Sequence, residues 1–84
     1  MKRTEVFKKL TDICREVFED EKLIITEETN AQEVAGWDSL THFSLISELE
    51  MAFNIRFTLG EIQGCKNVRE LVDALLLHLE EKDL

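Results

Sequence analysis

The sequence predicts an all-α fold: a small bundle of three long helices and one short helix, with a long loop between the first two helices. Three observations lead to this prediction. Apolar residues recur with the helical period of 3.6 in three segments, no segment shows a convincing β-strand alternation, and proline is absent. With 84 residues, 44% of them hydrophobic, the chain fits one domain covering residues 1–84.

The first helix is expected from about Thr4 to Glu19. Thr4 can cap it, because its hydroxyl can accept a hydrogen bond from an unpaired backbone N–H of the first turn. The apolar residues of this segment fall on one helical stripe: Val6, Phe7, Leu10, Ile13, Cys14, Val17 and Phe18.

Residues 20–37 lose the helical period, so a long loop is expected there. A helical turn can form over residues 29–34, and Gly36 permits a tight bend before Trp37. Six apolar residues are expected to anchor this loop to the core: Leu23, Ile24, Ile25, Ala31, Val34 and Trp37.

A second helix is expected to run to about Phe53, with either Asp38 or Ser39 as its N-cap. Its core side is expected to hold Phe43, Leu45, Ile46, Leu49, Ala52 and Phe53. At 100° per residue, a separate stripe away from the core collects Leu40, Ser44, Ser47 and Met51. Two apolar residues of this stripe, Leu40 and Met51, should therefore be exposed.

Two further helices follow. Thr58-Leu-Gly-Glu61 matches a capping box, and Gly64 is expected to end a one-turn helix in the left-handed conformation. Asn67 opens the last helix in a similar way. The apolar stripe of the last helix consists of Val68, Leu71, Val72, Leu75, Leu76 and Leu79.

The charge balance limits the possible partners. Eighteen acidic and ten basic residues give a formal charge of −8, which disfavours nucleic acids and anionic membranes and favours basic protein surfaces. No apolar run is long enough to insert into a membrane, and the first residues lack the apolar core of a secretory signal, so the cytoplasm is the expected location. Cys14 and Cys65 lack metal-site spacing, and we expect reduced, mostly buried thiols and no metal.

Ser39 has three possible roles on local chemistry alone. It can be an ordinary capping residue. It can also carry a phosphate at the positive end of the helix dipole. A hydrolase pairing with His42 is the least favoured role, because a bundle this small has little room for an orienting acid, an oxyanion hole and a substrate pocket. His42 and His78 are expected to be surface or boundary residues.

The stretch GWDSL, residues 36–40, resembles the phosphopantetheine-attachment motif of acyl carrier proteins. The order of elements from about Thr4 to Leu79 is similar as well: helix, long loop, helix beginning with D-S-L, short helix, final helix. The apolar positions that match are Leu40, Phe43, Ile46, Leu49, Phe53, Phe57, Cys65, Val68 and Val72.

This resemblance implies that Ser39 is esterified with 4′-phosphopantetheine from coenzyme A, whose thiol holds acyl groups as thioesters. The protein would then be a carrier rather than an enzyme, and a monomer. Asp38 would help to present Ser39 to a phosphopantetheinyl transferase, and acyl-loading and acyl-processing enzymes (a ligase, synthase or transferase) would be the other partners. The residues expected to recognise partners are Leu40, Ser44, Ser47, Glu50 and Met51.

The sequence also departs from the family pattern. Carriers of bacterial fatty-acid synthesis usually read D-S-L-D and carry more acids along the second helix, whereas this chain has Thr41, Ser44 and Met51 there and keeps Glu50. We therefore expect a specialised pathway, such as polyketide-like, modified-lipid or aminoacyl-transfer chemistry. A peptidyl or aminoacyl carrier and an unmodified helical adaptor are the alternatives.

Overall fold

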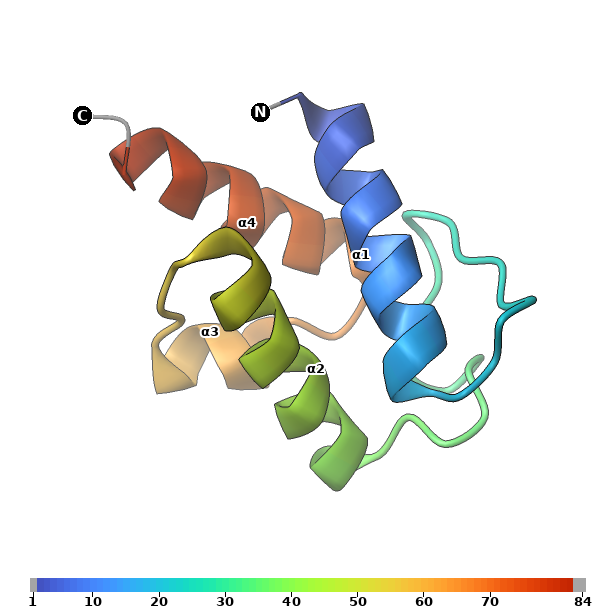
Figure 1. Cartoon of the computed structure of the whole chain (residues 1–84). Coiled ribbons are helices and arrows are strands. Elements are labelled where there is room, and N and C mark those ends of the chain that lie inside the picture. The colour runs from blue at the N-terminus through green and yellow to red at the C-terminus, as the bar shows by residue number, and fades with distance from the viewer. Residues whose placement is uncertain (1, 83–84) are drawn as a thin grey trace.

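The computed structural model describes residues 2–82, which form four α-helices and confirm the predicted order of three long helices and one short one (Figure 1). Within the described chain, β structure is limited to one isolated bridge between Asn30 and Asn67. The helices are α1 (Arg3–Val17), α2 (Ser39–Phe53), α3 (Leu59–Gly64) and α4 (Val68–Lys82).

The core lies between the three long helices. α1 contacts both α2 and α4, and the long loop that joins α1 to α2 lies outside them (Figure 1). α3 contributes no buried residue. The largest fully buried side chains come from α1, α2 and α4: Val6, Leu10, Cys14, Leu45, Leu49, Val68, Leu71, Val72 and Leu75.

The start of α1 differs from the prediction. The helix begins at Arg3 with Lys2 as N-cap, so the proposed cap, Thr4, lies inside the helix and is exposed. The Glu5 carboxylate accepts a hydrogen bond from the backbone N–H of Lys2 at 3.1 Å. A carboxylate in the first turn can satisfy this donor and also favours the positive end of the helix, so a hydroxyl cap is not required.

The loop is anchored less uniformly than predicted. Ile25, Val34 and Trp37 are buried, but Ile24 is 81% exposed. Neighbouring residues of an extended segment point to opposite sides, so three consecutive apolar residues cannot all face the core. Residues 29–34 form a hydrogen-bonded turn and not a helix. Backbone hydrogen bonds at 2.9 Å from Val68 and Arg69 to Thr29 and Glu27 tie the loop to α4.

α2 ends at Phe53 as predicted, but its buried face is narrower. Phe43 is 51% exposed and Ala52 is exposed, although both were expected on the core side. Phe43 lies about 100° from the centre of the buried face at 100° per residue, which places it on the border. Gly36 adopts φ +85° at the predicted bend, whereas Gly64 ends α3 without the predicted left-handed conformation.

Candidate functional site

The first turn of α2 is organised by Asp38, which decides which residue is the cap. The Asp38 carboxylate accepts a hydrogen bond from the backbone N–H of Thr41 at 3.0 Å. In return, the Thr41 hydroxyl accepts from the Asp38 N–H at 2.8 Å and donates to the Gly36 carbonyl at 2.6 Å. Because Asp38 serves as cap, the hydroxyl of Ser39, the first residue of the helix, is not needed for that role.

The electrostatics of this turn keep Asp38 ionised. The hydrogen bond from the Thr41 backbone N–H is the largest influence on its carboxylate and lowers the pKa of Asp38 below its usual value. The next residue, Ser39, is exposed at the same helix terminus, where unpaired N–H groups and the helix dipole favour a negative group. The turn therefore presents an exposed hydroxyl, that of Ser39, in a position where a phosphate group can be attached to it as an ester.

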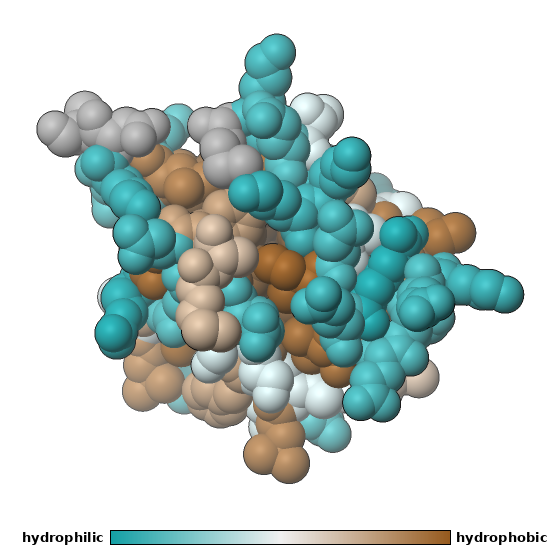
Figure 2. All heavy atoms as spheres, viewed as in Figure 1, coloured by the Kyte–Doolittle hydropathy of each residue, from teal (hydrophilic) through white to brown (hydrophobic). Residues whose placement is uncertain are grey.

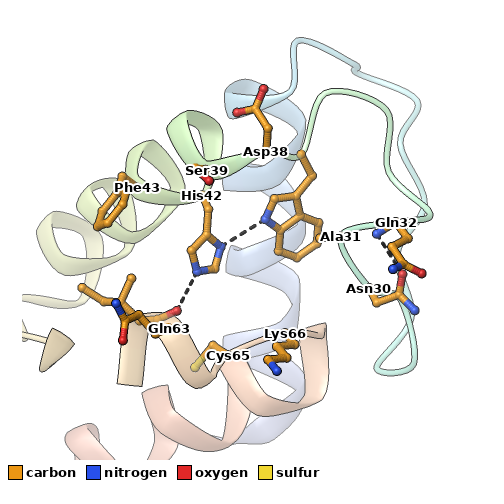
Figure 3. A pocket seen from close by; sticks show the side chains of 12 residues that line it. Asn30, Ala31, Gln32, Asp38, Ser39, His42, Phe43, Gln63, Cys65 and Lys66 are labelled. Atoms are coloured by element: carbon orange, nitrogen blue, oxygen red, sulfur yellow. Dashed lines mark hydrogen bonds between the residues drawn. The ribbon is translucent and has the colours of Figure 1, made fainter. Parts of the chain in front are cut away.

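A cavity of about 690 Å³ adjoins Ser39 (Figure 3). Ser39 and His42 border it from the first turn of α2, and Gln63, Cys65 and Lys66 border it from α3 and the following segment. Asn30 and Gln32 of the long loop lie at another edge of it in Figure 3. The remaining lining residues are Ala31, Trp37, Asp38, Phe43 and Ile62.

His42 does not act on Ser39. Its Nδ1 accepts a hydrogen bond from the Trp37 indole Nε1–H at 3.1 Å, and its Nε2 lies 2.8 Å from the Ile62 carbonyl oxygen (Figure 3). A carbonyl only accepts, so the proton is on Nε2. Both ring nitrogens are occupied, which removes the free base that a Ser39–His42 hydrolase needs.

The predicted exposed stripe of α2 is confirmed. Leu40 is 81% exposed and Met51 70% exposed, and the side chains between them, Ser44 and Ser47, are exposed as well. Glu50 differs from these four residues because it is half-buried and its carboxylate accepts a hydrogen bond from the Phe57 backbone N–H at 2.8 Å. Figure 2 shows apolar side chains on the surface over α2 and α3, whereas polar side chains cover most of the loop side.

Comparison with known proteins identifies the family. A similar structure is the solution NMR structure of holo acyl carrier protein from Geobacter metallireducens, which is 43% identical, covers 92% of this chain and 88% of that chain, and has a TM-score of 0.86. The sequence pattern of the phosphopantetheine attachment site family matches residues 8–75. The chain belongs to the acyl carrier protein family. No curated protein matches it.

Membership confirms two predictions. This acyl carrier protein is a non-catalytic carrier that a transferase modifies, and it holds 4′-phosphopantetheine covalently. The residues at the start of α2 fit such a group, because they combine an exposed hydroxyl, a helix N-terminus and an adjoining cavity. Carriers of this kind work with the modifying transferase and with acyl-processing enzymes.

The two cysteines are not paired in a disulfide. Cys14 and Cys65 are free and buried, as predicted, and burial raises their pKa values to about 12 and about 11.

Over residues 2–82, no group of three potential metal ligands is found. Within the same range, no helix has the length and apolar character needed to cross a membrane.

Sequence reasoning missed the inward orientation of His42 and the α3 side of the cavity. A signal for His42 was present, since it precedes Leu45, Ile46 and Leu49 by three, four and seven residues and so falls on the core side of α2. No comparable signal identified Ile62, Gln63 or Lys66. Their position depends on how the short α3 lies against the rest of the carrier.

Proposed function

We propose that Ser39 is the attachment site of the 4′-phosphopantetheine group and that the carrier holds acyl intermediates for partner enzymes. One observation carries this proposal: Ser39 is exposed at the first position of a 15-residue helix, beside a cavity of about 690 Å³, and Asp38 supplies the cap in its place. The serine hydroxyl is therefore accessible and not committed to local structure.

Two features of this chain support a phosphate ester at Ser39. The backbone N–H groups and dipole at the start of α2 stabilise negative charge close to the serine oxygen. Asp38 and Thr41 hold the turn through reciprocal hydrogen bonds of 3.0 Å and 2.8 Å. These bonds fix the backbone on both sides of Ser39 and so define the direction of its side chain. We assign to Asp38 the role of presenting Ser39 to the transferase.

The group supplies a thiol that carries acyl chains as thioesters. The protein supplies a small body that docks transiently on successive enzymes while its flexible arm reaches their active sites. The cavity beside Ser39 can cover part of a bound chain, with Phe43 and Ile62 among its apolar residues. Each methylene removed from water contributes about 0.8 kcal/mol, so a few buried carbons hold a cargo reversibly.

The exposed stripe of Leu40, Ser44, Ser47 and Met51 is proposed as the partner-recognition surface, with Glu50 at its border. α2 carries only two acidic residues, Glu48 and Glu50. The carboxylate of Glu50 is bonded to a backbone N–H of the carrier itself. A face with so few free acids fits basic enzyme patches poorly, which supports a specialised pathway. Housekeeping fatty-acid enzymes should therefore acylate or elongate this carrier less efficiently than their own, and equal efficiency would contradict this assignment.

The first experiment tests the attachment site. Intact mass is measured before and after incubation with coenzyme A, Mg²⁺ and a promiscuous phosphopantetheinyl transferase, for the parent, Ser39→Ala and Thr4→Ala. Thr4 is the control, because it is an exposed hydroxyl residue in the first turn of another helix, α1, and lies outside the proposed recognition surface. We expect one phosphopantetheine on the parent and on Thr4→Ala, and none on Ser39→Ala.

Two outcomes would contradict attachment of the group to Ser39. Modification of Ser39→Ala would place the group elsewhere. A folded parent that stays unmodified, with a control carrier modified in parallel, would favour an unmodified helical adaptor that binds partners through Leu40 and Met51. A peptidyl or aminoacyl carrier would instead be modified normally and then be loaded by an amino-acid-activating enzyme and not by an acyl ligase.

A further inference from the structure

The short helix α3 lies beside the cavity and is joined to the rest of the carrier by side-chain hydrogen bonds. It has six residues and contributes no buried residue, yet Ile62, Gln63 and the following Cys65 border the cavity beside Ser39. Both histidines of the chain contact this helix. His42 bonds the Ile62 carbonyl at 2.8 Å, and His78 bonds the Glu61 carboxylate at 2.9 Å.

The hydrogen bond from His42 meets a specific need of α3. Ile62 is the third residue from the end of the helix, so no backbone N–H within α3 lies four residues after it. Its carbonyl is one of the last four of a helix, which lack partners inside the helix. The Nε2–H of His42, a residue of α2 that also borders the cavity, supplies a donor to this carbonyl.

His42 is in turn held from the opposite side. The Trp37 indole N–H donates to its Nδ1 at 3.1 Å, and the two rings stack at a centroid distance of 6.1 Å and an angle of 22°. Trp37 is only 8% exposed, and the centroid of its ring lies 5.5 Å from the centroid of the Phe18 ring. A continuous series of contacts, the Trp37–His42–Ile62 bridge, therefore links the buried loop anchor through α2 to α3.

We propose that His42 is a positioning residue that holds α3 through the Trp37–His42–Ile62 bridge and so sets the width of the cavity beside Ser39. The cargo-related part of this inference rests on the proposed attachment at Ser39, whereas the bridge does not. One neutral hydrogen bond stabilises about as much as the burial of one or two methylenes. A chain of several carbons that enters between α2 and α3 can therefore displace the bond from His42 to Ile62.

The test uses the unmodified carrier and measures amide hydrogen exchange by NMR. His42→Leu removes both hydrogen bonds of the ring, and His42→Gln keeps an amide that can both donate and accept. We expect exchange of the hydrogen-bonded amides of Ile62 and Cys65 to be roughly 2- to 12-fold faster in His42→Leu, the range that corresponds to one lost hydrogen bond. Amides of α1 should keep their exchange rates, and His42→Gln should restore part of the protection.

A second variant guards against a general loss of stability. Trp37→Phe keeps an aromatic ring in the loop but removes the N–H that bonds Nδ1, so α3 should exchange faster than in the parent and the ring ¹⁵N shift of His42 Nδ1 should change. In the parent, the ring ¹⁵N shifts should show the proton on Nε2. Unchanged α3 exchange in folded His42→Leu, uniform acceleration of all four helices, or a proton on Nδ1 in the parent would each overturn the bridge.

The cargo is tested on the Ser39-modified carrier loaded with an eight-carbon acyl chain. We expect the His42 ring and Ile62 amide signals to shift on acylation, and the Ile62 amide to exchange faster than in the unacylated form. If these signals do not change, the cargo does not displace the bridge and that part is wrong. If the transferase adds no group, the proposed function fails instead, and the exchange rates of the unmodified carrier still decide the role of His42.

Discussion

The carboxylate of Glu50 accepts a hydrogen bond from the backbone N–H of Phe57, with the two atoms 2.8 Å apart. Glu50 lies near the end of α2 and Phe57 just before α3, so this bond closes the turn between the two helices. The acidic residue that matches the family pattern of partner recognition therefore has a structural role inside the carrier.

Replacement of Glu50 by alanine should destabilise the fold. The Phe57 residue is buried, and a buried N–H left without its partner costs about 1–3 kcal/mol. Glu48→Ala is the control, because Glu48 is an exposed acid of the same helix. Urea unfolding should show a lower free energy of unfolding for Glu50→Ala and little change for Glu48→Ala. Equal stability of the two variants would mean that Glu50 is available for partners.

The two leucines Leu10 and Leu40 should respond in opposite ways to the same substitution. Leu10 is 0% exposed in the core, so Leu10→Ala should lower the free energy of unfolding by about 2–5 kcal/mol. Leu40 is 81% exposed, so Leu40→Ala should change it by no more than about 0.5 kcal/mol. Binding to a partner enzyme should show the reverse order of effects. A large loss of stability in Leu40→Ala would show that its side chain is buried in solution.

Stability should fall at acidic pH through Glu27. The Arg3 guanidinium donates hydrogen bonds to Glu27 and, at 2.7 Å, to Asp73, and it lowers the pKa of Glu27 below its usual value of 4.5. A carboxyl whose folded pKa is lowered stabilises the fold above its unfolded pKa, and this contribution is lost as the pH falls through the folded pKa.

The test measures the free energy of unfolding of the parent, Glu27→Gln and Glu28→Gln at a series of pH values from pH 7 to pH 3. Glu27→Gln should be less stable than the parent at pH 7, and the difference should shrink below pH 4.5. Glu28→Gln is the control, because Glu28 is exposed next to it. A difference between Glu27→Gln and the parent that stays constant with pH would exclude the ion pair as its cause.

The buried cysteines predict the thiol chemistry of the carrier. Burial raises the pKa values of Cys14 and Cys65 to about 12 and about 11, so few thiolates exist at pH 8. An aromatic disulfide reagent should therefore react slowly with both in the folded, unmodified protein and quickly in denaturant. The modified carrier should gain one fast thiol, that of its arm, and Ser39→Ala should gain none. A fast thiol in the folded, unmodified protein would contradict the burial.

Local sequence signals predicted the starts of α2 and α3 well, whereas the local signals at Thr4 and Gly64 were wrong. The capping box of α3 is an example. The Thr58 N–H donates to the Glu61 carboxylate at 2.9 Å, and the Glu61 N–H donates to the Thr58 hydroxyl at 3.2 Å. The D-S-L helix start and the exposed Leu40 and Met51 follow from spacing in the same way. Signals of this kind depend only on neighbours along the chain.

Predictions that depended on distant neighbours were weaker. Ile24 was expected to anchor the loop and is 81% exposed, and Phe43 was expected on the core side and is 51% exposed. Apolar character alone cannot say which side chain the core has room for, because that depends on the elements that pack against it. The role of Glu50 was likewise hidden, since its partner lies seven residues away across a turn.

The amino-acid sequence alone determined the helical periodicity, the family motif and the serine at the start of α2, because each is written in the spacing of adjacent residues. Only the tertiary structure decided what surrounds that serine. His42 and Ile62 are twenty residues apart, yet the His42 Nε2 and the Ile62 carbonyl oxygen lie 2.8 Å apart because the fold brings α3 next to this part of α2. A hydrogen bond of this kind requires a donor and an acceptor brought together by packing, and sequence spacing does not encode that packing directly.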